Sequence, residues 1–364
     1  MPDPLLTAQN ARTTYLMRKK HNIAVIGYGW AATAHIAAIN ATSRGQVTAV
    51  WSSRALDAAE LTERHGSPIT PHTDLGKILS DPEIDVVDIT GYPDQHAAQF
   101  IAAARAGKHI IIEKPLAIDW SDVLAMKKAA IESGARVCVC FECRFSSQLV
   151  ATKSVIDSGL VGELHYGEVD YYHGIGPWYG QYRWNTKKAL GGSALLTAGC
   201  HAMDALLLCL GHDVEEVTSY SAQSKNAVFA PYEYPTTTTS LLKFAGGAVG
   251  KCAAVVDCMQ PYYFHTHLVG SEGSILDNKF HSQKIAGLDK SSWSQLSMKM
   301  LDSGDVSDHP YQMQFQAFFD ALDEGKDMLL TSFADAFSTH RVMAAADKSV
   351  AEKRPVKLSE FATA

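Results

Sequence analysis

The feature that most constrains this fold is a glycine-rich turn that directly follows an apolar strand. Residues 22–32 read NIAVIGYGWAA, and their unbroken apolar run is typical of a strand buried on both faces of a parallel sheet. Gly27 permits a tight turn, Gly29 lets the backbone approach a pyrophosphate, and Ala32 allows close helix–strand packing. A helix expected over residues 31–41 would direct its N-terminus at the phosphates. This context favours dinucleotide binding over an ordinary turn.

The end of the next strand bears on which dinucleotide is bound. A strand is expected over residues 46–51, and Ser52, Ser53 and Arg54 follow it. In an NAD site an acidic residue usually stands here and binds the ribose hydroxyls. No carboxylate is present to repel a 2′-phosphate, and Arg54 could pair with one. Alternatively the serines bind the ribose of NAD and Arg54 is a solvated charge, so NAD and NADP stay about equally open.

The first half of the chain alternates between strands and helices, which indicates a doubly wound parallel sheet. Ligands on such sheets bind beyond the carboxyl ends of the strands. Gly27, Thr90 and Lys114 all fall at such ends, so we expect them to meet at one crevice. The further strands are expected at 84–90, 109–112 and 136–140, and the helices at 55–65, 75–79, 96–106 and 120–133.

The second half of the chain contains successive strands with few helices between them, which favours antiparallel pairing. A boundary between the two halves is expected near residues 141–147. The strands are expected at 163–172, 214–222, 236–244, 247–257 and 263–269, and helices at 199–210, 311–323 and 333–351. The predicted class is α/β, with an N-terminal nucleotide-binding domain and a second domain built on a mostly antiparallel sheet.

Composition narrows the function classes. The 364 residues suit two domains, and a net charge of −7 without a basic run argues against a nucleic-acid partner. Seven scattered cysteines indicate reduced thiols in a cytoplasmic protein. We expect no membrane partner, because no apolar stretch is judged long enough to span a bilayer. Residues 1–20 are interpreted as a flexible N-terminal arm rather than a secretory signal.

Two groups of potential metal ligands are interpreted as ordinary side chains. Cys138, Cys140 and Cys143 have no second cluster of zinc-like spacing and are expected to be core thiols. His265 and His267 alternate on a strand without a third obvious ligand. We therefore expect no metal site.

Taken together, the motifs resemble the Gfo/Idh/MocA oxidoreductases over roughly residues 20–345. The matching segments are GYGWAA, ITGYPDQH, AGKHIIIEKPLA, RFSS, LVGELHYGEV and LGGSALLTAGCHAMDAL. The resemblance implies a Rossmann domain over residues 21–143 and a substrate-binding and oligomerisation domain over 144–364, with a large, mostly antiparallel open sheet. That sheet commonly forms the interface of a homo-oligomer. The implied activity is NAD- or NADP-dependent hydride transfer at a ring hydroxyl of a sugar, glycoside or cyclitol.

The resemblance also implies the catalytic residues. Lys114 of the Glu113-Lys114-Pro115 motif matches the family lysine, and near a nicotinamide its pKa is expected to be lowered so that it acts as a base. The alternative for Lys114 is a plain ion pair with Glu113. His201 matches the family histidine that contacts the reacting hydroxyl. Many relatives carry an aspartate four residues earlier, where this chain has Thr197, and Asp204 could orient His201 or only pair locally.

The remaining site predictions fall into two sets. The aromatic-rich segment 171–184 suits stacking on a pyranose, although a packed interface loop is an equally open interpretation, and Tyr262, His265 and His267 are less defined candidates. The predicted substrate-binding residues are Thr197, Arg144, Tyr172, His173, Trp178 and Arg183. The predicted cofactor-binding residues are Gly27, Tyr28, Gly29, Trp30, Ala32, Ser52, Ser53, Arg54, Thr90, His96, Glu113 and Lys114.

Two other functions stay open beside a freely exchanging dehydrogenase. One is a dehydrogenase of glycosides, acting for example at the 3-position, that holds its cofactor tightly and recycles it between two substrates. The other is a regulator that binds a dinucleotide without turnover. The presence of both Lys114 and His201 argues against the regulator.

Overall fold

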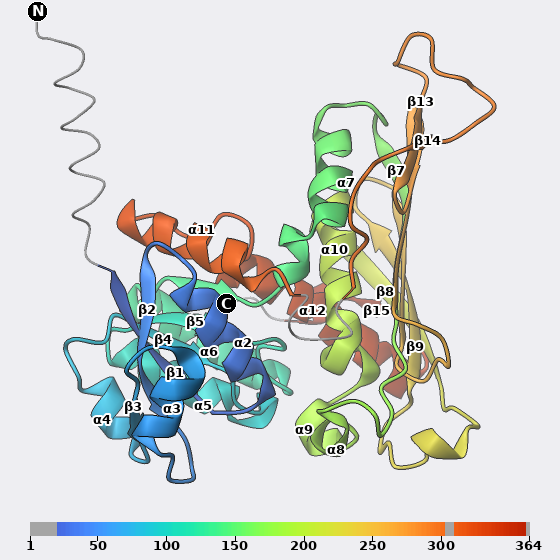
Figure 1. The fold of residues 1–364 in the computed structure, drawn as a ribbon. Coiled ribbons are helices and arrows are strands. Elements are labelled where there is room, and N and C mark those ends of the chain that lie inside the picture. Colours follow the sequence, from blue (N-terminus) through green and yellow to red (C-terminus); the bar gives the residue numbers. More distant parts are fainter. Residues whose placement is uncertain (1–19, 303–308, 362–364) are drawn as a thin grey trace, which may run out of the picture.

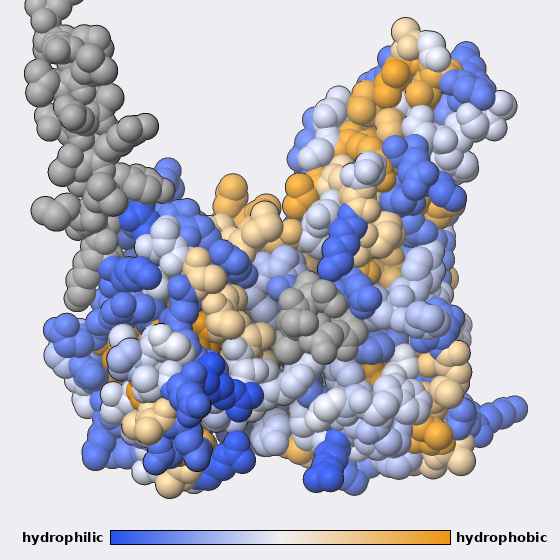
Figure 2. Space-filling model, viewed as in Figure 1, coloured by the Kyte–Doolittle hydropathy of each residue, from blue (hydrophilic) through white to orange (hydrophobic). Residues whose placement is uncertain are grey.

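The computed structural model describes residues 20–302 and 309–361, and these form two lobes that lie side by side (Figure 1). The predicted N-terminal arm lies outside the described residues, apart from Lys20. In the space-filling view, a notch separates the two lobes, and hydrophobic side chains gather along the upper part of the second lobe (Figure 2).

The first lobe is a parallel sheet of six strands in the order β3-β2-β1-β4-β5-β6, which confirms the predicted Rossmann architecture. Its core is apolar on both faces, as the unbroken apolar runs require. The strands are β1 (His21–Ile26), β2 (Gly45–Trp51), β3 (Thr70–His72), β4 (Val86–Ile89), β5 (His109–Ile112) and β6 (Val137–Val139). The helices are α2 (Trp30–Asn40), α3 (Ala58–His65), α4 (Leu75–Leu79), α5 (Pro93–Arg105) and α6 (Trp120–Ser133).

The second lobe is built on a nine-stranded sheet in the order β14-β13-β12-β11-β7-β10-β9-β8-β15. Its pairs are antiparallel except for β7 and β10, which run parallel. The prediction of a large, mostly antiparallel sheet is therefore confirmed. The strands are β7 (Leu164–Tyr172), β8 (Val214–Ala222), β9 (Thr237–Phe244), β10 (Val249–Val255), β11 (Tyr263–Gly270), β12 (Gly273–Leu276), β13 (Lys279–Ser282), β14 (Ser294–Gln295) and β15 (Val356–Lys357).

Helices α10 and α12 pack on one face of this sheet, whereas the other face carries no helix in the described residues (Figure 1). A π-helical segment, η2 (Leu195–Gly199), leads directly into α10 (Cys200–Leu210). The other helices are η1 (Glu142–Phe145), α7 (Ser147–Asp157), α8 (Tyr182–Asn185), α9 (Lys188–Gly191), η3 (Ala227–Phe229), α11 (Tyr311–Asp323), α12 (Phe333–Glu352) and η5 (Leu358–Glu360).

Helix α11 returns the chain to the first lobe. It packs against α2, and its buried Phe315, Phe318 and Phe319 share a core with Ile36 and Ile39 of that helix. The division expected at residue 143 therefore does not hold for this helix, which follows the second sheet in sequence but belongs to the first core.

The expectation that no apolar stretch is long enough to span a bilayer is wrong by length and composition. Within the described residues, the segment Lys188–Leu210, which spans α9, η2 and α10, is by length and composition alone long and apolar enough to cross a membrane. However, 83% of its most apolar window is buried inside the protein, so the stretch packs as the central helix of the second lobe.

Candidate active site

The glycine turn has the geometry that a pyrophosphate requires. Gly27 has a φ of +96°, and a Cβ atom there would lie 3.0 Å from the backbone of Gly91. Helix α2 begins after Gly29, without a side-chain cap and without an acidic residue in its first turn. The start of this helix lines an open cavity of about 170 Å³. Because no side chain caps its first N–H groups, they can donate hydrogen bonds to an anion bound there.

This cavity is the cleft between the lobes, and residues from both sides line it. From the first lobe come the α2 N-terminus and the ends of β4 and β5; from the second come α8 and the segment before it. The lining residues are Gly29, Trp30, Ala31, Thr90, Gly91, Tyr92, Pro93, Glu113, Lys114, Gly180, Gln181 and Trp184. The strand ends that were expected to converge therefore do so.

The end of β2 presents an exposed cation beside the glycine turn. Ser52 is buried, and its hydroxyl accepts a hydrogen bond of 3.3 Å from the Arg54 amide. Ser53 and Arg54 are exposed, and the Arg54 guanidinium donates to the Tyr28 carbonyl at 3.5 Å. Tyr28 itself contacts His65 Nε2 through its hydroxyl at 2.9 Å. The exposed Arg54 guanidinium thus lies beside the glycine turn, where it could pair with a ribose hydroxyl or a 2′-phosphate.

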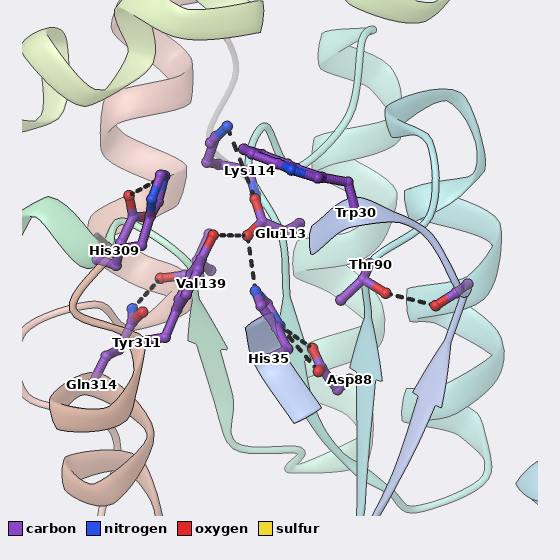
Figure 3. A network of polar contacts seen from close by, with 12 residues as sticks. Trp30, His35, Asp88, Thr90, Glu113, Lys114, Val139, His309, Tyr311 and Gln314 are labelled. Atoms are coloured by element: carbon purple, nitrogen blue, oxygen red, sulfur yellow. Dashed lines mark hydrogen bonds and ion pairs between the residues drawn. The ribbon is translucent and has the colours of Figure 1, made fainter. Parts of the chain in front are cut away.

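Glu113 is the centre of a buried polar network beneath the cleft (Figure 3). Its Oε1 accepts from His35 Nε2 at 3.0 Å and from the Tyr311 hydroxyl at 2.6 Å. His35 Nδ1 lies 3.0 Å from both carboxylate oxygens of Asp88. Burial alone would lower the pKa of His35, but Asp88 and Glu113 outweigh it and raise that pKa to about 10. His35 is therefore an imidazolium that donates to two carboxylates.

Lys114 stands above this network (Figure 3). It lines both the cleft and a smaller pocket. Its Nζ lies 4.0 Å from Glu113 Oε2. Burial opposes the charge of the ammonium, but attraction to the Glu113 carboxylate outweighs burial and raises the pKa of Lys114. The alternative of an ion pair with Glu113 describes this geometry, and the lowering of the pKa that is expected beside a bound nicotinamide stays a prediction.

The smaller pocket joins the cleft at Lys114 and holds His201 and Thr197. Burial and the nearby Lys114 ammonium keep the pKa of His201 well below 6.5, so its imidazole is neutral. The Thr197 hydroxyl donates to the Gly191 carbonyl at 2.8 Å and contacts the Tyr234 hydroxyl at 3.0 Å. The pocket is lined by Lys114, Tyr171, Ile175, Tyr179, Gln181, Asn185, Thr197, Ala198, His201 and His309.

Glu142 is a neighbour of this pocket that sequence reasoning missed. It lies in η1 directly after β6 and is 0% exposed. Its Oε1 lies 3.8 Å from His201 Nε2 and 3.6 Å from His309 Nε2. Burial and the Glu113 carboxylate, only partly offset by Lys114, raise the pKa of Glu142 to about 8. The carboxyl group holds its proton at neutral pH.

Arg144 and Asp204 pair with each other, away from the substrate pocket. The Arg144 Nε and Nη2 atoms donate to the two Asp204 oxygens at 2.6 and 2.7 Å, and Thr339 also donates to Asp204. Arg144 Nη1 donates to the Leu330 carbonyl, and the arginine is 4% exposed. The structure therefore uses Arg144 to join η1, α10 and α12, and it leaves Asp204 paired locally rather than orienting His201.

Strand and helix geometry directs two other predicted residues, Tyr172 and Arg183, away from the small pocket. Side chains alternate along β7, so Tyr171 faces the pocket, whereas Tyr172 points to the opposite face, where it donates to Asp170 and stacks on Tyr263. Tyr172 therefore does not line the small pocket, and its contact with the substrate stays a prediction. Arg183 is exposed on α8, and its neighbours Trp184 and Asn185 line the cavities instead.

His96, predicted to bind the cofactor, lies under the lip of the cleft. It is 0% exposed, and its ring nitrogens lie 2.8 Å from the Pro115 carbonyl and 3.2 Å from the Gly91 carbonyl. His96 therefore joins two loops that line the cleft and does not itself face it. Ala32 is also fully buried, as a helix–strand packing position requires.

A third cavity, of about 480 Å³, lies beyond the aromatic-rich segment. His173 and Trp178 line it together with Tyr262, and Trp178 is 60% exposed. Burial lowers the pKa of His173 to about 4. The predicted substrate residues His173 and Trp178 thus form an aromatic rim next to the smaller pocket, since His173 contacts Tyr171 and Tyr179 of that pocket.

Three groups of histidine, cysteine and carboxylate side chains lie close enough to share a cation. They are His35, Glu113 and Cys140; Glu142, Cys143 and His201; and Glu168, His265 and His267. In the first group His35 and Glu113 already bond each other, and in the third Lys251 Nζ lies 2.6 Å from Glu168 Oε1. The prediction of no metal site is neither supported nor contradicted by these three groups.

All seven cysteines, which lie within the described ranges, are free of disulfide bonds.

The two lobes coincide with two known domains. A family model for NAD-binding Rossmann-fold oxidoreductases, GFO_IDH_MocA, matches residues 21–141, and the GFO/IDH/MocA C-terminal domain matches residues 149–276. Inositol 2-dehydrogenase 2 of Saccharopolyspora erythraea is 30% identical over 261 residues, which cover 70% of this chain and 72% of that protein. The scyllo-inositol 2-dehydrogenase (NAD(+)) of Bacillus subtilis is 26% identical over 283 residues, covering 78% and 80%.

Solved structures agree with the fold. Levoglucosan dehydrogenase in complex with NADH superposes with a TM-score of 0.81 at 23% sequence identity, and the match covers 93% of this chain and 99% of that one. A probable dehydrogenase from Thermotoga maritima gives a TM-score of 0.77 at 22% identity, with 94% and 100% covered.

Proposed function

The chain belongs to the Gfo/Idh/MocA family of NAD-binding oxidoreductases, and we propose that it transfers a hydride between a dinucleotide and a ring hydroxyl of a sugar, glycoside or cyclitol. The single observation that carries this proposal is the position of Lys114. It lines both the cleft below the glycine turn and the small pocket that holds His201. A ring hydroxyl that reaches that pocket from the cleft therefore meets an acid–base pair at the end of a dinucleotide site.

The residues present fit a dinucleotide. The uncapped α2 N-terminus and the open space at Gly29 suit a pyrophosphate, and a bound nicotinamide would supply the hydride acceptor or donor. Ser53 and Arg54 would contact the adenosine ribose. Because no acidic side chain follows β2, the site accommodates NADP as well as NAD, and the choice between them depends on Arg54.

Lys114, His201 and Thr197 would have different roles in the transfer of the hydroxyl proton. The Lys114 ammonium, held charged by Glu113, would donate a hydrogen bond to the substrate oxygen and stabilise negative charge that develops on it. The neutral His201 imidazole can accept the hydroxyl proton on one nitrogen while it donates from the other. Thr197 cannot titrate near neutral pH and would position the ring through its hydroxyl.

The aromatic rim supports a ring-shaped substrate that extends beyond the reacting carbon. The small pocket has room for about one water-sized group, whereas the neighbouring cavity at His173, Trp178 and Tyr262 is much larger. A substituent on the sugar, such as a glycoside aglycone, would occupy this second space. Relatives that act on inositols and on levoglucosan support the ring-hydroxyl class.

The exposed side chains of the second sheet and the state of the cysteines support proposals for the assembly of the protein and for its location. The face of the second sheet without helices exposes Tyr220, Leu241, Val249 and Tyr263, by 74%, 50%, 44% and 38%. We infer that this face joins copies of the chain into a homo-oligomer, since exposed apolar groups on a flat sheet favour association. The unpaired thiols support a cytoplasmic location.

A cofactor and substrate screen tests the proposal. Purified protein is first analysed by mass spectrometry for bound NAD or NADP, and then offered myo-inositol, levoglucosan and a panel of glucosides while nicotinamide absorbance is followed. Turnover of a ring alcohol with release of reduced cofactor supports the proposal. Bound cofactor that reduces without exchanging would show an internally recycling enzyme. Dinucleotide binding without any turnover would show a regulator and contradict the proposal.

A further inference from the structure

The carboxyl group of Glu142 is buried without the contacts that a structural carboxylate normally has. Its Oε1 faces His201, His309 and the Cys143 thiol, which donates at 3.5 Å. Its Oε2 is buried and has no hydrogen-bond partner among the described residues. Leaving a buried carboxyl oxygen unpaired costs stability, so the position of Glu142 calls for an explanation, and a role in proton transfer at the adjacent pocket is one.

The other carboxyl groups near His201 are already engaged. Asp204 accepts hydrogen bonds from Arg144 and Thr339. Glu113 accepts from His35 and Tyr311. Thr197 lines the same pocket as His201 and carries no charge. Glu142 is therefore the carboxyl group that remains available to His201.

We propose that Glu142 holds the proton of the reaction and exchanges it with the substrate hydroxyl through His201. This inference rests on the proposed function. In oxidation, the O–H bond of the substrate breaks and its proton binds one imidazole nitrogen, while the proton on the other nitrogen moves to the Glu142 carboxylate. The electrons of the carbinol C–H bond leave with the hydride, so a ketone and a neutral Glu142 result. Reduction is the reverse, and Glu142 then supplies the proton.

The geometry suits a relay. His201 Nε2 lies 3.8 Å from Glu142 Oε1, and catalytic hydrogen bonds of this length commonly shorten once substrate is bound. The second ring nitrogen, Nδ1, has no hydrogen-bond partner in the described part of the chain and belongs to a residue that lines the pocket. The pKa of about 8 for Glu142 lets it gain and lose a proton near neutral pH.

The charged and titratable groups around Glu142 determine when it titrates. Burial and the Glu113 carboxylate favour its neutral form, whereas Lys114 favours its charged form. The groups that face it from the surrounding elements are Glu113 and Lys114 after β5, Cys140 and Cys143 near β6, Cys200 and His201 of α10, and His309 and Tyr311 at the start of α11. Oxidation needs the carboxylate, so its rate should rise as pH passes through about 8; reduction needs the acid and should fall there.

Three variants test the proposal. Glu142→Gln keeps the shape but cannot exchange a proton, and Glu142→Asp keeps a carboxyl group. The matched control is Glu132→Gln on α6, whose side chain is 62% exposed. In oxidation of myo-inositol, or of the best compound from the screen, we expect Glu142→Gln to lower kcat by a factor on the order of 10 to 10² with KM nearly unchanged. It should also abolish the pH dependence near 8, which Glu142→Asp should restore in part.

A readout without cofactor or substrate separates this proposal from the proposed function. Infrared difference spectra, recorded while the protein is titrated, should show a protonated carboxylic acid that ionises near pH 8 in the wild type and in Glu132→Gln but not in Glu142→Gln. If no ring alcohol is turned over but the infrared band that depends on Glu142 is present, the proposed function is contradicted. The assignment of Glu142 as a group that binds and releases a proton near pH 8 is then still supported.

Two results would overturn the inference. One is an unchanged pH profile and infrared signal in a folded Glu142→Gln protein. The other is one equivalent of zinc bound by the wild type and lost in Glu142→Gln, because Glu142, Cys143 and His201 would then be metal ligands.

Discussion

Replacing His35 by phenylalanine is the strongest test of the buried network beneath the active site. The imidazolium is fully buried and bonds Asp88 and Glu113 at 3.0 Å. Its pKa is about 10 in the folded protein, against 6.5 for an ordinary histidine. At about 1.4 kcal/mol per pKa unit, this difference corresponds to about 5 kcal/mol of stabilisation at low pH. Losing one partner of a buried ion pair costs about 3–5 kcal/mol, which agrees with that figure.

The pH dependence of the free energy of unfolding distinguishes the loss of the His35 charge from a simple loss of packing. Because the folded pKa of His35 is raised, its contribution is complete below pH 6.5 and is lost as pH rises toward 10. The free energy of unfolding of His35→Phe should therefore fall below the wild-type value by about 3–5 kcal/mol near pH 6. This gap should shrink by about 3 kcal/mol near pH 9.

The matched control is His340→Phe, which also removes a buried histidine. His340 Nε2 lies 2.9 Å from the Ala117 carbonyl, and burial lowers its pKa to about 4. Its contribution is complete above pH 6.5 and is lost only as pH falls toward 4, so its effect should be constant between about pH 7 and pH 9. Urea unfolding followed by circular dichroism measures both variants. Equal, pH-independent losses for the two would refute the imidazolium assignment.

Three further substitutions test the site. Lys114→Ala should lower turnover by a factor on the order of 10² or more while cofactor binding, measured by fluorescence titration, stays nearly intact; wild-type turnover would contradict its role. Arg54→Ala should weaken NADP more than NAD in the same titration, and equal effects would favour an NAD enzyme. His201→Ala should reduce kcat far more than Thr197→Val, which should keep the wild-type pH–rate profile, because the threonine hydroxyl does not titrate.

The sequence predicts the regular elements well where their pattern is long or apolar. Strand β5, helix α6 and helix α11 have the predicted bounds to the residue. The short edge strands β3, β14 and β15 were missed because two or three residues give no measurable alternation. The amphipathic pattern of α11 shows that one face is buried, but it does not say against which lobe, so its packing on α2 could not be foreseen.

For the candidate site too, the sequence predicts which segments meet but not which individual side chains face the pocket. That Gly27 lies against Thr90 and that Thr90 and Lys114 line one cleft follows from the parallel sheet. Which of two adjacent tyrosines faces the pocket depends on strand register, and the sequence alone did not fix it for Tyr171 and Tyr172. The raised pKa of Lys114 depends on a network of long-range contacts, since Glu113 is held by His35 and Tyr311 from distant segments.

Thr197 and Glu142 both lie near the imidazole of His201. Thr197 lines the pocket with His201, and Glu142 Oε1 lies 3.8 Å from His201 Nε2. If Glu142 acts by exchanging a proton with His201, a carboxylate placed at position 197 should make it dispensable. In a Thr197→Asp protein, adding Glu142→Gln should change kcat little, whereas Glu142→Gln in the wild type should lower kcat by a factor on the order of 10 to 10². The two positions would then be strongly non-additive, as expected for groups that act on one imidazole. Additive losses in the double variant, in a protein that still binds cofactor, would show that Glu142 supports the fold and not the proton path.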